Sequence, residues 1–456
     1  MHYHFIAIGG SAMHNLALAL HDAGHKITGS DDKIFDPSRS RLEAKGILPK
    51  EEGWFPKKLE NEVDAVILGM HARADNPELA KAQEIGLKIF SYPEFLFELS
   101  KNKTRVVIGG SHGKTTITAM ILHVLNFYKK DFDYMVGAQL DGFDNMVKIS
   151  DAPLIILEGD EYHASPLDPR PKFHLYNPQI ALVSGIAWDH INVFPSKEEY
   201  AKQFEIFVSM VEDVGTLVYN NTDEEVRKIA MSESKRLFLM PYNYTEYEIK
   251  GESTVIFFNG LRYELNIFGK HNLLNMEGAR KICRRLGVNN REFFFAMKSF
   301  EGASRRLETF HECEKGVIYR DFAHAPSKLE ATIEAVKKQF DVPLVAVFEL
   351  HTYSSLNPEF LPEYRNTMDE ADHAVVFFNK ETLEQKKLPP LSKEQVALHF
   401  GRNKDFEVIT ERPKLLKYLE NIDYPKYNLL MMSSGTFNGL KLKKMALKLF
   451  PENGGE

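Results

Sequence analysis

The sequence has little of what marks a secreted, membrane-bound or nucleic-acid-binding protein. Its 456 residues include two cysteines, Cys283 and Cys313, too few for a disulfide framework or a zinc finger. No apolar run approaches the ~18 residues of a membrane span, and the N-terminus lacks the basic stretch of a signal peptide. The net charge of −7 arises from 57 basic and 64 acidic side chains without long runs of one sign. These absences predict a cytoplasmic protein that binds neither nucleic acid nor membrane.

The chain is long enough for several independent cores. A length of 456 residues gives a prior of about three domains, and 43% hydrophobic with 27% charged residues is ordinary for a globular protein. Apolar segments of strand length alternate with helical patterns along the chain, without internal repeats. This alternation predicts the α/β class, with three domains over residues 1–102, 103–301 and 302–456.

The first domain begins with a pattern that is typical of a Rossmann-like unit. Residues 3–8 and 26–29 read as strands, and residues 12–23 between them read as an amphipathic helix. The loop at residues 7–12, Ala-Ile-Gly-Gly-Ser-Ala, keeps the middle glycine of the dinucleotide fingerprint but has alanine at its first and third glycine positions. Asp31 lies ~20 residues further on, where an acid that reads the ribose is expected. The pattern fits a dinucleotide or another nucleotide diphosphate at the helix N-terminus.

A strand, a glycine loop and an apolar helix follow one another within residues 104–127. Such a loop directs backbone N–H groups and the positive end of a helix dipole at one point, which favours a phosphate. The loop reads Gly110-x-x-Gly113-Lys114-Thr115, and Ile108 stands where the usual P-loop has its first glycine. The motif predicts that Lys114 reaches the terminal phosphates of a nucleoside triphosphate and that Thr115 ligates Mg²⁺.

Acidic and histidine side chains follow two later strands of the second domain. Glu158 comes directly after an apolar strand, where nucleotide-binding sheets place the acid that holds a phosphate-bridging Mg²⁺. The alternative is a solvated acidic turn, and that reading weighs more for Asp160 and Glu161. His190 is either a second metal ligand or a hydrogen-bonded loop histidine, and a sheet edge shared with Glu158 favours the metal.

Polar residues near the start of a helix and near the start of the third domain have two readings each. His271, Asn272 and Asn275 lie within one helical turn, where they read the edge of a base or cap the helix. Arg305 and Arg306 suit a phosphate that is clamped from a second domain, or form a charged surface turn. The spacing alone leaves these readings open.

The whole set of motifs is more specific than any one of them. In chain order they are Gly110-Ser111-His112-Gly113-Lys114-Thr115-Thr116, Glu158-Gly159-Asp160-Glu161, Asp189-His190, His271-Asn272-x-x-Asn275, Arg305-Arg306 and Asp321-x-x-His324-x-Pro326. This series resembles the Mur ligase family over essentially the whole chain. The resemblance implies a Rossmann-like N-terminal domain, a central P-loop ATPase-like domain and a Rossmann-like C-terminal domain. It also implies a ligase that uses ATP and Mg²⁺ to join the carboxylate of UDP-N-acetylmuramate to an amine through an acyl phosphate.

The resemblance extends to the amine substrate. It is greatest to the branch of the family that uses the murein tripeptide L-alanyl-γ-D-glutamyl-meso-diaminopimelate in peptidoglycan recycling, although residues 351–354, His-Thr-Tyr-Ser, lack the arginine of that branch. The alternative amine is free L-alanine, in peptidoglycan biosynthesis. A non-catalytic sugar-nucleotide sensor is the alternative from another class. We expect a monomer or a weak homodimer.

The resemblance also implies roles for individual residues. Those implied for the UDP-sugar are Gly9, Gly10, Ser11, Asp31 and His71. Those implied for ATP are Gly110, Ser111, His112, Gly113, Lys114, Thr115, Thr116, His271, Asn272, Asn275, Arg306 and Asp321. The implied metal ligands are Thr115, Glu158 and His190, and the implied peptide-binding residues are His351, Tyr353, Ser433 and Phe437. The implied catalytic residues are Lys114, Glu158, His190 and Arg306.

Overall fold

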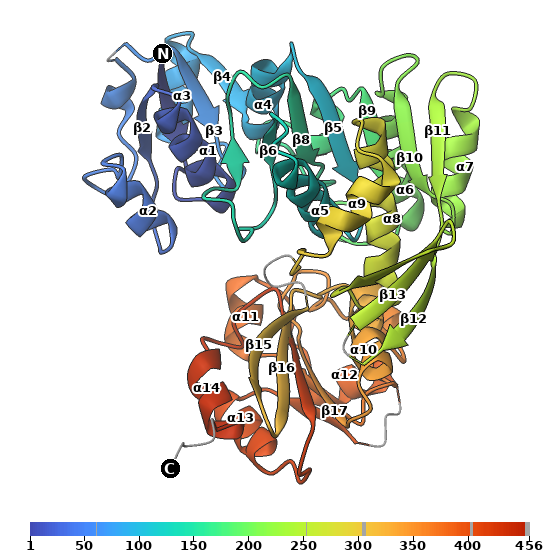
Figure 1. Cartoon of the computed structure of the whole chain (residues 1–456). Helices are drawn as coiled ribbons and strands as arrows, with labels where there is room; N and C mark the ends of the chain where they lie inside the picture. Colours follow the sequence, from blue (N-terminus) through green and yellow to red (C-terminus); the bar gives the residue numbers. More distant parts are fainter. Residues whose placement is uncertain (61, 252, 303–306, 402–404, 452–456) are drawn as a thin grey trace, which may run out of the picture. The chain divides into compact units, whose positions relative to one another are not determined.

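The computed structural model describes residues 1–451 apart from 61, 252, 303–306 and 402–404 (Figure 1). The chain divides into two compact units. The first consists of Met1–Ile186, Ala201–Asn243 and Gly278–Ala296, and the second of Ala187–Tyr200, Tyr244–Glu277 and Met297–Glu456. Both units are built from strands and helices around largely parallel sheets, which confirms the predicted α/β class. Within the described part of the chain, no helix has both the length and the apolar character to cross a membrane.

A four-stranded parallel sheet in the order β2-β1-β3-β4 forms the N-terminal part of the first unit. Its strands are β1 (His2–Ile6), β2 (Lys26–Ser30), β3 (Ala65–Leu68) and β4 (Lys88–Ser91). Its helices are α1 (Ser11–Asp22), α2 (Ser38–Ala44), η1 (Pro56–Glu60), α3 (Pro77–Glu84) and α4 (Tyr92–Ser100). In such an arrangement the loops after β1 and β3 lie at the same sheet edge, where ligands of open α/β sheets bind. This confirms the predicted Rossmann-like unit.

A seven-stranded sheet in the order β11-β10-β9-β5-β8-β6-β7 forms the rest of the first unit, and only the β6–β7 pair is antiparallel. Its strands are β5 (Thr104–Gly109), β6 (Asp133–Met135), β7 (Val147–Lys148), β8 (Leu154–Glu158), β9 (Ile180–Val183), β10 (Thr216–Asn220) and β11 (Phe238–Tyr242). The connecting elements are α5 (Lys114–Phe127), η2 (Lys172–Leu175), α6 (Lys197–Ser209), α7 (Glu224–Ser232) and α9 (Asn290–Met297). The loops after β5 and β8 therefore meet at one edge, as the phosphate and Mg²⁺ motifs require.

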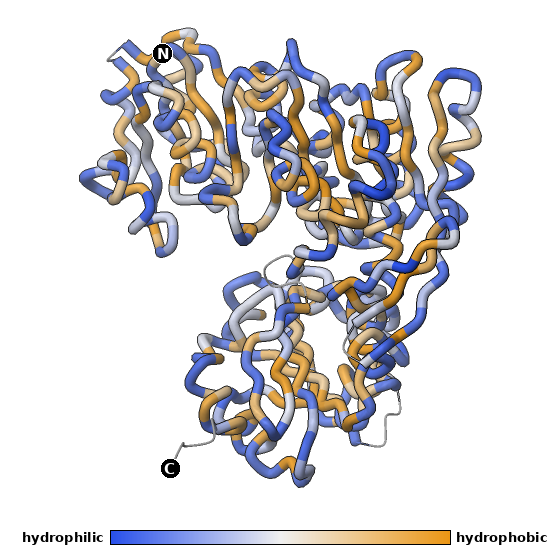
Figure 2. Tube along the Cα trace, viewed as in Figure 1, coloured by the Kyte–Doolittle hydropathy of each residue, from blue (hydrophilic) through white to orange (hydrophobic). Residues whose placement is uncertain are grey.

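Burial follows the apolar sequence around β5. The side chains of Val106, Val107 and Ile108 in β5 are fully buried, and α5 buries most of its residues on all sides. Figure 2 shows this strand and helix as predominantly hydrophobic. A helix that is buried on nearly all sides lies inside the unit. Its packing holds the loop between β5 and α5 in place.

The second unit contains a six-stranded sheet in the order β15-β16-β20-β17-β18-β19, in which only β15 is antiparallel to its neighbour. The strands are β15 (Glu308–Cys313), β16 (Gly316–Asp321), β17 (Leu344–Glu349), β18 (His373–Phe377), β19 (Phe406–Ile409) and β20 (Asn428–Met432). The helices are α10 (Pro326–Gln339), η3 (Leu361–Tyr364), α11 (Lys380–Gln385), α12 (Lys393–Phe400), α13 (Arg412–Glu420) and α14 (Leu442–Leu449). Side chains that alternate along the strands contribute to two hydrophobic clusters, one of which includes α10 and the other α13 and α14.

A small antiparallel sheet in the second unit was not expected from the sequence. It consists of β12 (Glu246–Lys250), β13 (Ser253–Phe258) and β14 (Leu261–Leu265), and is followed by α8 (Lys270–Arg285). The strand β12 is largely exposed and carries two glutamates and a lysine. A strand that buries so little has no clear apolar pattern, so it is only weakly indicated by the sequence.

Candidate active site

The loop between β5 and α5 has the backbone geometry that a phosphate site needs. Gly110 and Gly113 have φ angles of +135° and +79°, in the left-handed region that residues with a side chain rarely adopt. A Cβ atom on Gly110 would lie 2.0 Å from the Ser184 hydroxyl oxygen. The loop is anchored to the neighbouring strand edge, because the Ser111 N–H donates to the Gly185 carbonyl at 2.9 Å. The N–H groups of the first turn of α5 and its helix dipole favour an anion at this loop.

Lys114 lies among carboxylates at the start of α5. Its Nζ donates to Glu161 Oε2 at 2.6 Å and to the Gly110 carbonyl at 2.5 Å. Burial alone would lower the pKa of Lys114, but the charges of Glu161, Asp160 and Glu158 outweigh it and raise the pKa. The ammonium group is therefore charged at neutral pH, and a phosphate can replace Glu161 as its partner.

Thr115 and Glu158 form the second polar pair at this edge. The Thr115 hydroxyl donates to Glu158 Oε1 at 2.8 Å, and the Gly137 N–H donates to Glu158 Oε2 at 2.8 Å. The part of the chain that the structure describes contains no group of three or more His, Cys, Asp or Glu side chains that could hold a metal ion. A Mg²⁺ ion beside a nucleotide does not need such a group, because it binds through one or two protein ligands, phosphate oxygens and water. The hydroxyl and carboxylate oxygens of this pair fit that ion.

The second unit contains most of the other residues that the sequence assigned to ATP. His271, Asn272 and Asn275 lie in the first turns of α8, and burial lowers the pKa of His271 to about 4. Asp321 ends β16, and its carboxylate accepts the N–H groups of Leu307 and Ala323, each at 2.6 Å. Asp321 therefore holds the backbone of two loops, a role that the sequence did not indicate. Arg305 and Arg306 lie outside the described residues, so the predicted phosphate clamp stays a prediction.

The segment that carries Asp189 and His190 belongs to the second unit, where it contacts His324 of another sequence motif and Ser354. Asp189 accepts the Ser354 hydroxyl at 3.4 Å and lies 3.7 Å from His324 Nε2. Burial would raise the pKa of Asp189, but the charges of His190, His324 and Lys328 lower it to about 2. His190 has a φ of +55°, a conformation that is strained for a residue with a side chain and that is often found at functional sites.

The residues expected to bind the amine substrate gather around a buried acid that the sequence analysis missed. Glu349, at the end of β17, accepts the Ser433 hydroxyl and the Phe437 N–H, the latter at 2.8 Å. A Cβ atom on Gly435 would lie 2.5 Å from the His351 ring, so this loop packs directly against His351. Tyr353 stands apart, with 41% of its surface exposed. An acid at the C-terminal end of a parallel strand, like Glu158, was the signal that could have identified Glu349.

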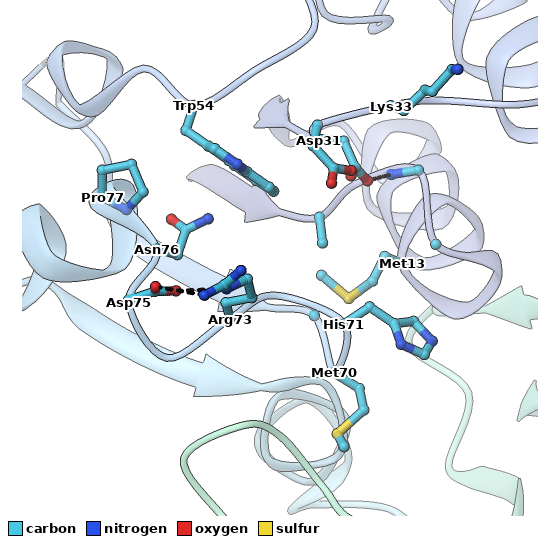
Figure 3. Close-up of a pocket in the computed structure, with 15 residues that line it drawn as sticks. Met13, Asp31, Lys33, Trp54, Met70, His71, Arg73, Asp75, Asn76 and Pro77 are labelled. Atoms are coloured by element: carbon cyan, nitrogen blue, oxygen red, sulfur yellow. Dashed lines mark hydrogen bonds and ion pairs between the residues drawn. The ribbon is translucent and has the colours of Figure 1, made fainter. Parts of the chain in front are cut away.

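A cavity of about 420 Å³ lies at the edge of the first sheet where β1 and β3 end (Figure 3). Four of the five residues expected to bind the UDP-sugar line it, namely Gly9, Gly10, Asp31 and His71. Ser11 begins α1 beside them. The Trp54 ring and the Asp31 carboxylate point into the space, and Arg73 on its wall forms an ion pair with Asp75 at 2.9 Å. The flat ring, the acid and the arginine are suited to a base, a ribose and a phosphate.

The turn that borders this cavity keeps the geometry of a glycine loop. Ala7 has a φ of +67° although it is not glycine, and Gly9 leaves no room for a side chain because a Cβ atom would lie 2.9 Å from Asp31 Oδ2. The Gly9 N–H donates to the same oxygen at 2.7 Å. Alanine in the left-handed region costs about 1 kcal/mol, so the turn is retained at some cost in stability.

The ionisation of Asp31 should make the stability of this unit depend on pH. Burial, with a smaller contribution from Asp32, raises the pKa of Asp31 from 3.8 to about 6, although the hydrogen bond from the Gly9 N–H partly offsets the increase. The folded state therefore keeps this proton to higher pH than the unfolded state, and the stabilisation present below pH 4 is lost between pH 4 and 6. Replacing Asp31 by Asn should remove this loss, so that the variant gains about 2 kcal/mol relative to wild type between pH 4 and 7.

Urea unfolding at both pH values measures this difference. An exposed aspartate elsewhere in the same unit provides the control, since Asp131→Asn should change stability by less than about 0.5 kcal/mol at either pH. An Asp31→Asn variant whose stability relative to wild type is the same at pH 4 and pH 7 would contradict the assigned titration.

A comparison with known proteins identifies the family. A UDP-N-acetylmuramate–L-alanine ligase from Caldanaerobacter subterraneus is 30% identical over 432 residues, which cover 91% of this chain and 91% of the relative. The chain belongs to the Mur ligase family. The model described as "Mur ligase family, catalytic domain" matches residues 2–104, and the "Mur ligase middle domain" model matches residues 108–282. This Mur ligase is accordingly an ATP-dependent enzyme of peptidoglycan metabolism that forms an amide bond.

Solved structures show the same Mur ligase fold. A UDP-N-acetylmuramate–alanine ligase from Thermotoga maritima matches with a TM-score of 0.71 at 21% identity and covers 98% of each chain. A murein peptide ligase from Psychrobacter arcticus matches with a TM-score of 0.69 at 22% identity and covers 99% of each chain. The two values are so similar that the fold does not discriminate between the amine substrates.

Proposed function

We propose that this Mur ligase joins the lactyl carboxylate of UDP-N-acetylmuramate to the amino group of L-alanine. The observation that carries the proposal is the arrangement at the edge of the seven-stranded sheet, where a glycine loop, a charged lysine and the Thr115–Glu158 pair converge. The nucleotide-sized cavity in the first sheet of the same unit supports a UDP-sugar as the second ligand. The L-alanine ligase that is 30% identical supports the choice of amine.

The chemistry follows from the low reactivity of a carboxylate. An amine does not displace oxide from a carboxylate at neutral pH, so the oxygen must first become a phosphate leaving group. In our proposal a carboxylate oxygen attacks the γ-phosphorus of ATP, the bond to the β–γ bridging oxygen breaks, and an acyl phosphate and ADP form. The amine nitrogen then attacks the acyl carbon, loses a proton, and inorganic phosphate leaves.

The first step brings two anions together, and the residues at the loop lower its electrostatic cost. Lys114 is charged and lies at the loop, where it would bind the terminal phosphates. In our proposal Arg306 supplies a second positive charge to the phosphates. Thr115 and Glu158 would hold a Mg²⁺ ion, and His190 a second one; when bound, these ions neutralise phosphate charge. Asp31, Gly9 and Gly10 would hold the UDP part of the acid substrate at the cavity.

The murein tripeptide is the second candidate amine, and the sequence motifs favour it. Both candidates present the amino group of an L-alanyl residue, so the same reaction centre serves either. The His351 loop, Ser433 and Phe437, which gather around Glu349, would bind the part of the amine substrate beyond that group. Tyr353, exposed on the same segment, would contact only a longer substrate. We also propose that the enzyme acts in the cytoplasm, where ATP and the UDP-sugar are available.

One assay tests the function and the amine together. ADP release is measured with UDP-N-acetylmuramate and Mg²⁺, and free L-alanine is compared with L-alanyl-γ-D-glutamyl-meso-diaminopimelate. We expect release that requires the UDP-sugar and an amine, and a higher kcat/KM with L-alanine. A higher kcat/KM with the tripeptide would assign the enzyme to recycling. Binding of the UDP-sugar without any ADP release would instead support a non-catalytic sensor.

A further inference from the structure

The loop of residues 136–146, which joins β6 to β7, connects the two candidate ligand sites of the first unit. At its beginning, the Gly137 N–H donates to Glu158 Oε2 at 2.8 Å, beside the phosphate loop. At its end, the Asn145 amide donates to the Asn15 carbonyl at 2.8 Å, and the Met146 N–H donates to Asn15 Oδ1 at 3.2 Å. Asn15 lies in α1, the helix that begins at the cavity of the first sheet. A single loop thus contacts Glu158 and the helix that borders the cavity.

Arg41 of α2 ties this loop to α1. Its Nη2 donates to the Asp144 carbonyl at 3.0 Å and to Asn145 Oδ1 at 3.3 Å. Its Nη1 donates to Asn15 Oδ1 at 2.8 Å and lies 3.3 Å from His14 Nε2. The guanidinium group therefore divides its donors between the loop of residues 136–146 and the helix α1. The planar fork of arginine allows this, whereas a lysine ammonium group could not span both.

The network continues from Arg41 to the wall of the cavity. Burial lowers the pKa of His14, and Arg41 lowers it further, so the imidazole is neutral at pH 7. Because Arg41 donates towards Nε2, the proton of the ring resides on Nδ1, which lies 3.0 Å from the Gly10 carbonyl. Gly10 lines the cavity. The contacts thus run without interruption from Glu158 through Gly137, the loop and Arg41 to Gly10.

We propose that Arg41 is a positioning residue that couples the sugar-nucleotide cavity to the ATP site. The inference rests on the proposed function of the two sites. When a ligand fills the cavity, it restrains Gly10 and α1. Through its hydrogen bonds Arg41 then restrains the loop of residues 136–146, and this loop holds Glu158 in position. Each ligand should then bind more tightly when the other is present, by the same factor in both directions, since such coupling is reciprocal.

Calorimetric titration of UDP-N-acetylmuramate, with and without saturating β,γ-imido-ATP and Mg²⁺, tests the inference. In the wild type we expect the nucleotide analogue to lower the Kd of the UDP-sugar about tenfold. In Arg41→Met the nucleotide analogue should lower the Kd of the UDP-sugar by less than about threefold, while each ligand still binds alone. In steady-state kinetics of this variant, the KM of the UDP-sugar should rise more than kcat falls. Arg41→Lys should not restore the coupling, because one ammonium group cannot contact both partners.

The matched control is Arg39→Met on the same helix. Arg39 forms an exposed ion pair with Glu52 at 3.2 Å, a contact that does not involve the loop of residues 136–146, so this variant should keep wild-type coupling. Asn145→Ala removes the contact from the side of the loop and should lose coupling as Arg41→Met does, which keeps the test valid if one variant folds poorly.

Independent binding in the wild type, or full coupling in both Arg41→Met and Asn145→Ala, would overturn the inference. Failure of the wild type to bind UDP-N-acetylmuramate at all would instead overturn the proposed function of the cavity.

Discussion

Replacing Lys114 by alanine should lower kcat about 10³-fold or more and leave the affinity for UDP-N-acetylmuramate nearly unchanged. The ammonium group is the charged donor at the phosphate loop, and loss of one such donor typically costs 10²–10³-fold in kcat. The cost should be at the upper end here, because two anions meet in the first step. ADP release and calorimetric binding of the UDP-sugar measure the two effects separately.

The variant needs a control for folding, because Glu161 loses its ion pair with Lys114. Glu161 is 1% exposed, and removing one member of a buried ion pair costs about 3–5 kcal/mol. The double variant Lys114→Ala/Glu161→Gln removes that charge and should fold like wild type while remaining inactive. Lys172→Ala offers a matched change at the neighbouring ion pair with Asp160 and should retain most activity. Turnover within about tenfold of wild type in the double variant would refute the role of Lys114.

Replacing Glu158 by glutamine should lower kcat/KM for ATP about 10²-fold or more and raise the Mg²⁺ concentration needed for half-maximal rate. The substitution keeps the shape of the side chain. Its amide oxygen can accept the Gly137 N–H, and its NH₂ group can donate to Thr115, whose hydroxyl can turn to accept. The fold should therefore remain while the negative charge that attracts Mg²⁺ is lost.

Activity over a series of Mg²⁺ concentrations distinguishes this effect from a general loss. Asp160→Asn, two residues away, changes the same charge at a half-exposed position that pairs with Lys172, and should leave the Mg²⁺ dependence near that of wild type. An unchanged Mg²⁺ dependence in Glu158→Gln would show that the ion, if bound, is held elsewhere.

The sequence predicted the strand, glycine loop and helix of residues 104–127 well because the signal there is local. Glycines that require left-handed backbone, a lysine and a threonine follow one another within six residues, and a strand must precede them. Glu158 could also be predicted, since an acid directly after an apolar strand lies at the same sheet edge whatever the rest of the chain does. The family resemblance rested on the same positions, and the comparisons confirm the family.

The partners of these residues could not be predicted, because they depend on loops whose paths the sequence does not determine. The reading as a solvated acid weighed more for Glu161 than for Glu158, yet Glu161 is buried against Lys114. Glu349 was not predicted as a site residue, although its carboxylate binds the loop that contains Ser433 and Phe437. Asp321 was expected to face the nucleotide, and the structure shows both of its oxygens accepting backbone N–H groups. The role of Asp321 towards ATP stays a prediction.

The close approach of Gly110 to Ser184 limits how this enzyme can evolve. Two independent obstacles exclude any other residue at position 110, namely the left-handed backbone and the 2.0 Å distance that a Cβ atom would have to the serine oxygen. A smaller residue at position 184 would remove the contact with the oxygen but not the left-handed backbone, and the backbone nitrogen of residue 184 would still lie 2.9 Å from the Cβ atom. Any lineage that alters this loop must therefore do so at positions other than Gly110.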